Sequence, residues 1–116
     1  MGLPSAVGDW LTLPDVAERL GVPVTRVRDL VRDGKLIALR AAADAPLQVP
    51  AALVGPTGAV KHLDAVVTLL RDAGYGDEEI VGWLFTPDPS LPGTPAEALA
   101  ADRATEIKRR AQALGF

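Results

Sequence analysis

A short turn near the N-terminus constrains this chain most, because it separates two segments that each have helical periodicity. Apolar residues recur at helical spacing from Leu13 to Leu20 and again from Val24 to Val31. Gly21 is typical of a helix end, and Pro23 cannot continue a helix. With only three residues between them, the two short helices are expected to pack together as a helix-turn-helix.

The start of the first helix and the end of the second have sequence signals of their own. Thr12 is a good N-cap residue, and Pro14 suits the first turn of a helix. Pro23 has no side-chain oxygen with which to cap the second helix. The Asp33-Gly34 pair predicts the end of that helix.

The next segment predicts a small wing of two strands. Residues Leu36–Arg40 alternate weakly, Ala41–Pro46 reads as a loop, and Leu47–Val49 is suited to a return strand. Pro50–Gly58 contains two prolines and two glycines, which indicates a boundary.

Beyond this boundary the pattern is helical. Four segments are expected to be helices, the third beginning at a Thr-Pro-Ala-Glu capping box: 63–73, 77–85, from Thr94, and about 103–114. Residues 86–93 contain three prolines and are expected to form a loop. The fold expected is therefore mainly α, with a flexible leader at 1–8, a winged helix-turn-helix at 9–54 and a helical C-terminal domain at 59–116.

Composition excludes several classes of site. The chain has 116 residues and no cysteine, so thiolate chemistry is impossible. Its single histidine, His62, is too few for a histidine-based metal cluster and leaves one candidate for a Ser-His pair. No glycine-rich phosphate loop is present, and Asp77, Glu78 and Glu79 suit the start of a helix. We expect no enzyme activity, no cofactor and no metal.

Positive charge is concentrated in the second helix and the segment after it. Residues 24–40 hold five cationic and two acidic side chains, a local +3 in a chain whose formal net charge is −3. The outward face of this helix is suited to contacting DNA bases and phosphates. By charge alone, a solvated amphipathic helix with internal ion pairs explains it equally well.

A family resemblance favours the DNA-binding interpretation. The residues that carry it are Trp10–Val22, Val27-Arg28, Leu30–Leu36 and Val49-Pro50. This stretch of about forty residues resembles the winged helix-turn-helix of MerR and excisionase-type DNA-binding proteins. The resemblance implies a recognition helix in the major groove of double-stranded DNA and a wing beside the backbone.

The resemblance also implies roles for particular residues. Thr25, Arg26 and Arg28 would face the groove, and Arg32, Lys35 and Arg40 would lie nearer to phosphates. Two departures weaken this transfer: Pro23 stands where a capping serine is common, and the wing is rich in alanine with Asp44 near its tip.

Residues 103–114 span fewer than two heptads, which is too short for the long coiled coil by which MerR regulators dimerise. The C-terminal half therefore differs from that of MerR regulators. The C-terminal half contains the segments Leu69–Tyr75, Glu78-Glu79, Trp83–Thr86 and Leu91–Pro95. With them, the whole chain resembles a small actinobacterial family that joins the winged module to a short helical domain. The pattern Trp83-Leu84, Pro87, Leu91, Gly93, Pro95, Glu97 and Leu99 is also similar to the toxin-binding domain of Xre-type antitoxins. Trp83-Leu84-Phe85 suits either a partner-binding patch or, as we expect, the core.

These observations predict a sequence-specific DNA-binding protein, acting as a transcriptional regulator. The alternative is a protein-interaction module, antitoxin-like or regulator-binding, that uses the C-terminal helices. We expect a monomer or weak dimer in the cytoplasm, associated with the nucleoid and not with membranes. The resemblance adds a Ser/Thr kinase as a candidate partner, without indicating the residue that it would modify.

Overall fold

The helix-turn-helix is present in the computed structural model, which describes residues 3–115. It consists of α1 (Leu13–Leu20) and α2 (Val24–Arg32). The Thr12 hydroxyl accepts a hydrogen bond from the Asp15 backbone N–H at 3.2 Å, so the predicted cap is confirmed. Gly21 ends α1 in the left-handed conformation, with φ of 66°. Pro23 precedes α2 and makes no side-chain cap.

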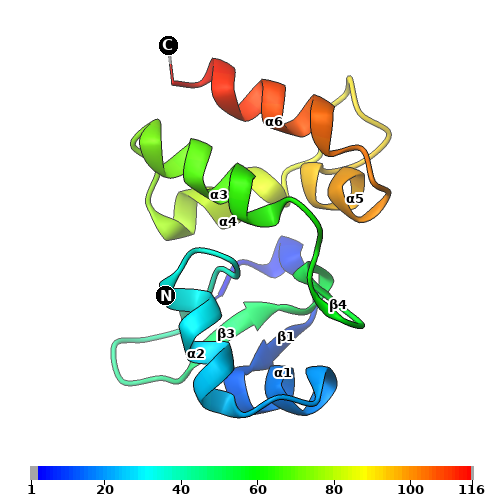
Figure 1. Ribbon diagram of the computed structural model, residues 1–116. Helices are drawn as coiled ribbons and strands as arrows, with labels where there is room; N and C mark the ends of the chain where they lie inside the picture. The colour runs from blue at the N-terminus through cyan, green and yellow to red at the C-terminus, as the bar shows by residue number, and fades with distance from the viewer. Residues whose placement is uncertain (1–2, 116) are drawn as a thin grey trace.

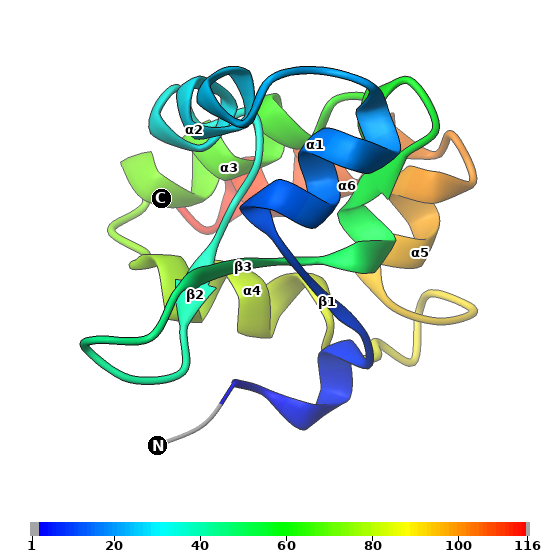
Figure 2. The same cartoon turned by 90° about the horizontal axis from the view of Figure 1, so that it is seen from below.

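A three-stranded antiparallel sheet packs against α1. It contains β1 (Trp10–Thr12), β2 (Leu39–Arg40) and β3 (Leu47–Pro50) in the order β1-β3-β2. Strands β2 and β3 form the predicted wing, whose loop projects from the edge of the molecule (Figure 2). Strand β1 was not predicted; it pairs with the other edge of β3 in the register Trp10↔Pro50.

The wing begins later in the chain than the sequence predicts. Residues 36–38 are buried but pair with no strand, and only Leu39 and Arg40 join the sheet. The reason is local: the backbone N–H groups of Lys35 and Leu36 both donate to the Leu30 carbonyl, at 2.9 and 3.2 Å. These two hydrogen bonds keep the chain in a turn at the end of α2, and the strand begins only at Leu39.

Part of the flexible leader predicted for residues 1–8 forms a turn that packs on the protein. Ser5–Val7 forms a single 3-10 turn, η1. Val7 is 8% exposed and belongs to the hydrophobic core, so the turn packs against the rest of the protein through this side chain. Met1, Gly2 and Phe116, which fall in the predicted leader and C-terminal domain, lie outside the described residues.

Two short elements occupy the predicted boundary. A 3-10 turn, η2 (Ala51–Leu53), leads into a hairpin of β4 (Val54–Gly55) and β5 (Gly58–Ala59). The Val60 N–H donates to the Leu53 carbonyl at 2.9 Å and closes this connection.

Four helices follow, as predicted: α3 (Leu63–Asp72), α4 (Asp77–Leu84), α5 (Pro95–Ala100) and α6 (Ala104–Ala113). The capping box at the start of α5 is present, with the Thr94 hydroxyl 3.1 Å from the Glu97 backbone N–H that donates to it. Helices α3 and α6 lie side by side (Figure 1). Within residues 3–115, no helix combines the length and the apolar character needed to cross a bilayer.

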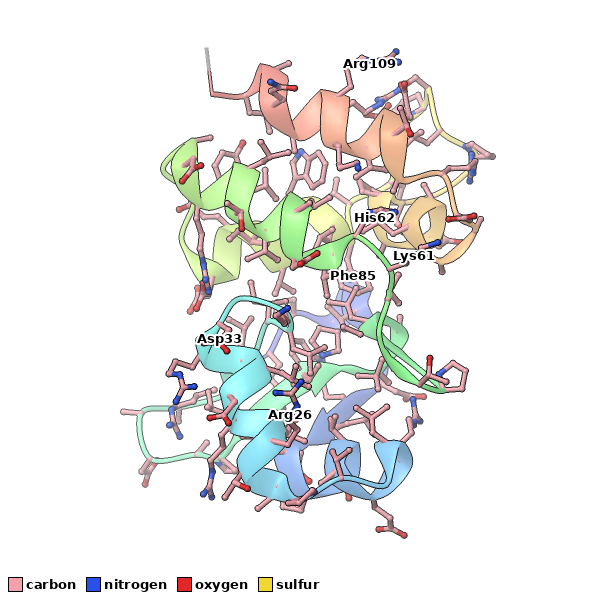
Figure 3. All side chains as sticks on the ribbon, viewed as in Figure 1. Arg26, Asp33, Lys61, His62, Phe85 and Arg109 are labelled. Carbon is pink, nitrogen blue, oxygen red and sulfur yellow. The ribbon has the colours of Figure 1, made fainter. Side chains whose placement is uncertain are left out.

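Figure 1 shows two stacked lobes, which we call the N-terminal lobe (residues 3–59) and the C-terminal lobe (residues 60–115). One continuous core joins them. Leu84 is fully buried and Phe85 is 7% exposed, which confirms that this segment is core; Trp83 is partly buried against it. Phe85 lies at the level where the lobes meet (Figure 3), and α5 packs against η2 of the other lobe.

Candidate nucleic-acid interface

Helix α2 has a buried apolar side and an exposed polar side. Val27 is fully buried, and Val24, Leu30 and Val31 are partly buried against the core. The polar residues of the helix project away from this packed side. All six residues expected to contact DNA are exposed: Thr25, Arg26, Arg28, Arg32, Lys35 and Arg40.

Helix geometry divides these residues between two flanks of α2. Successive residues turn by about 100°, so Thr25, Arg28 and Arg32 lie along one stripe. Arg26 is two residues before Arg28 and therefore projects from the opposite flank. The family resemblance groups Arg26 with Arg28 as residues that face the groove. The structure separates them and leaves Asp29 between the two flanks.

The cationic side chains also differ in how far they are engaged within the protein. Arg32 forms ion pairs with Asp29 at 3.0 Å and with Asp33 at 3.4 Å, and its side chain stays 70% exposed. In residues 3–115, Arg26 and Arg28 form no side-chain ion pair. The two guanidinium groups nearest the start of the helix are therefore available to a ligand.

Beyond the helix, Arg40 has an internal role in the wing. Its Nη1 atom donates to the Ala45 carbonyl at 2.6 Å, which closes the loop between β2 and β3. Lys35 directly follows Gly34 at the end of α2 and is exposed. Of the three residues expected near phosphates, Lys35 alone has no ion pair or side-chain hydrogen bond within the described chain.

Acidic groups border this basic surface on the side of the C-terminal lobe. A surface hollow of about 570 Å³ lies between the wing and the start of α4, and Asp77 and Glu78 line it opposite Arg40. Negative charge here disfavours a phosphate backbone in the hollow.

Arg71 is a residue that sequence reasoning missed. It lies in the last turn of α3, and its Nη1 atom would be 3.1 Å from a Cβ built on Gly34, the buried residue after α2. Its Nη2 atom donates to Asp77 Oδ1 at 3.1 Å. No local pattern signals this contact, because Gly34 and Arg71 are far apart in sequence.

The single histidine lies away from the candidate interface, at the start of α3. His62 is exposed before α3, with a left-handed φ of 67°. Residues 3–115 contain no group of three or more His, Asp or Glu side chains able to hold a metal ion.

Comparison with known proteins gives matches over both lobes. Residues 3–54 match the family model described as "DNA-binding protein Rv2175c, wHTH domain", and residues 60–115 match "Rv2175c C-terminal domain of unknown function". A curated relative, the DNA-binding protein Rv2175c of Mycobacterium tuberculosis (strain ATCC 25618 / H37Rv), is 44% identical over 117 residues. That alignment covers 90% of this chain and 79% of the relative.

A solved structure has the same fold. The NMR structure of Rv2175c superimposes with a TM-score of 0.81 at 40% sequence identity, covering 93% of this chain and 82% of that one. The similarity therefore extends through the winged helix-turn-helix and the C-terminal helices together.

Proposed function

This chain belongs to the Rv2175c family, and from that membership we propose that it binds double-stranded DNA sequence-specifically and acts as a transcriptional regulator. The observation that carries the proposal is the exposed face of α2. Arg26 and Arg28 project there from an apolar-backed helix and have no acidic partner in residues 3–115. Arginine on the first turns of such a helix can donate two hydrogen bonds to guanine.

The MerR and excisionase resemblance makes the proposed docking more specific. We place α2 in the major groove with the wing beside the backbone, as in that class of proteins. Lys35 would contact phosphate directly. Arg32 and Arg40 would have to share their guanidinium groups with Asp29 and the Ala45 carbonyl.

We also propose that the protein associates with the nucleoid, as expected of a DNA-binding regulator. Regulation by a Ser/Thr kinase, which the resemblance implies, also belongs to the proposal, and no residue is assigned to it.

The second candidate function is a protein-interaction module. Leu114 is the large hydrophobic residue exposed in residues 3–115, at 41%, and it borders a hollow shared with Trp83 and Pro87. In this alternative the helix-turn-helix serves as a scaffold, and the C-terminal helices bind another protein.

The two functions are separated by selecting duplexes from a random pool and measuring affinity by fluorescence anisotropy. On a selected duplex, Arg26→Ala and Arg28→Ala are each expected to cost about 1–3 kcal/mol and to relax the preference at one base pair. Arg103→Ala, an exposed arginine of the C-terminal lobe, is the matched control and should bind normally. If both α2 variants stay folded and keep full affinity, the groove assignment is wrong and the interaction module is favoured.

A further inference from the structure

Two side chains of α3, Arg71 and Val67, approach the chain just after α2 at Gly34. Gly34 is buried and has φ of 75°, a conformation that glycine adopts without strain. Because Gly34 has no side chain, Arg71 can approach closely, with Nη1 3.1 Å from where a Cβ would lie and Val67 Cγ1 at 3.9 Å. Figure 3 shows the neighbouring Asp33 at this junction between the lobes.

Charge favours this position for the Arg71 guanidinium. The C-terminal end of a helix carries partial negative charge from its carbonyl groups, and a cation there is stabilising. At this end of α2 the Leu30 and Val31 carbonyls accept from Lys35, Leu36 and Gly34. Asp77, at the start of α4, holds the other side of the guanidinium at 3.1 Å.

We propose that Arg71 is a positioning residue for DNA recognition, locking the recognition helix α2 onto the C-terminal lobe through Gly34 and Asp77. This inference rests on the proposed DNA-binding function and adds a role for the C-terminal lobe. Arg71 itself touches no DNA. It restricts the orientation of α2, so that Arg26, Arg28 and Lys35 reach the duplex from a fixed support.

The first test compares the DNA affinity of two variants that each remove one negative charge. Removing an acidic residue from a DNA-binding protein ordinarily strengthens binding, because it lowers the repulsion of phosphates. Glu78→Gln should behave in this way. Asp77→Asn removes the same charge one residue earlier but releases Arg71, so it should bind a selected duplex about two- to fivefold more weakly than Glu78→Gln. Equal or tighter binding by Asp77→Asn would overturn the proposal.

The second test distinguishes positioning from direct phosphate contact. Arg71→Ala should weaken affinity about two- to fivefold while the slope of log K against log salt concentration stays unchanged. A slope reduced by about one would show that Arg71 itself neutralises a phosphate, which contradicts the proposal. Arg71→Lys, which keeps the charge, should recover part of the loss. Arg109→Ala, an exposed arginine on α6, is the control.

The third test needs no DNA. Amide hydrogen exchange at Gly34, Lys35 and Leu36 should be faster in Arg71→Ala than in wild type, with exchange in α6 unchanged. Unchanged exchange at the end of α2 would refute the lock even if DNA binding is intact. If wild-type protein selects no duplex, the proposed function fails, and hydrogen exchange still decides whether Arg71 holds α2.

Discussion

Lys35 and the arginines of α2 should respond differently to mutation, although all are exposed cations within ten residues. Arg26 and Arg28 project from opposite flanks of a regular helix, where the planar guanidinium can meet the edge of a base. Lys35 follows the helix, beyond a glycine, and carries a flexible point charge. A position outside the helix favours a phosphate over a base.

We therefore expect Lys35→Ala to weaken binding to selected and unrelated duplexes by the same factor and to reduce the salt slope by about one. Titrations at several salt concentrations measure both quantities. The melting temperature should change little, because the side chain is exposed and forms no ion pair in the described residues. A loss confined to the selected duplex would instead make Lys35 a base-reading residue.

The loop between α4 and α5 is held to α6 by Asp88. The carboxylate accepts hydrogen bonds from the Ser90 backbone N–H at 2.9 Å and from the Ser90 hydroxyl at 2.8 Å, and it pairs with Arg110 at 3.0 Å. These groups stabilise the charged form, so the pKa of Asp88 is lowered, first by the Ser90 hydrogen bonds and then by Arg110.

A lowered pKa in the folded state means that the stabilisation is present above the unfolded pKa, 3.8, and is lost as the pH falls through the folded pKa. Urea unfolding of wild type between about pH 5 and pH 2 should therefore show a decline in the free energy of unfolding that is shallower in Asp88→Asn. An equally steep decline in the variant would place the acid sensitivity elsewhere.

Elements with strong local signals were predictable from the sequence. Helix α5 follows a Thr-Pro-Ala-Glu box, and α1 ends at a left-handed glycine, so both are determined by neighbouring residues. Strand β1 was not predictable, because it is three residues long and its partner Pro50 lies forty positions later. The β4-β5 hairpin was interpreted as a boundary because Gly55 and Gly58 suit a linker and a tight turn equally.

The sequence names candidate residues for the site but not their geometry, and the contact of these residues with DNA stays a prediction. The charge pattern and the resemblance indicated α2 and the wing, and all six residues are exposed. The pairing of Arg32 with Asp29 and the fold of Arg40 onto the Ala45 carbonyl depend on side-chain positions that spacing alone does not determine.

The two lobes should unfold together, because one hydrophobic core spans both. The chain offers a probe in each: Trp10 lies in β1 of the N-terminal lobe, and Trp83 lies in α4 of the C-terminal lobe. In Trp10→Phe and in Trp83→Phe, denaturant unfolding can be followed by the fluorescence of the remaining tryptophan. The two variants should show transitions of the same width. In each variant, the fluorescence midpoint should match the midpoint found by circular dichroism. Separate transitions would show that the lobes are independent.

The second whole-molecule prediction concerns oligomeric state. Helix α6 has ten residues, fewer than two heptads, which is too short for a stable coiled coil. Light scattering at micromolar concentration should give the mass of a monomer, 12.1 kDa, or a weak concentration-dependent increase. A tight dimer at that concentration would contradict this expectation.

The central position of β3 in the sheet has a consequence for how the chain acquires its structure during synthesis. Strand β1 leaves the ribosome early, but its partner register, Trp10↔Pro50, cannot form until forty more residues have been added. Contacts so distant along the chain are slow to close. The nascent N-terminal lobe therefore spends an interval with an unpaired edge strand, a state in which a truncated message or a stalled ribosome would release an aggregation-prone fragment.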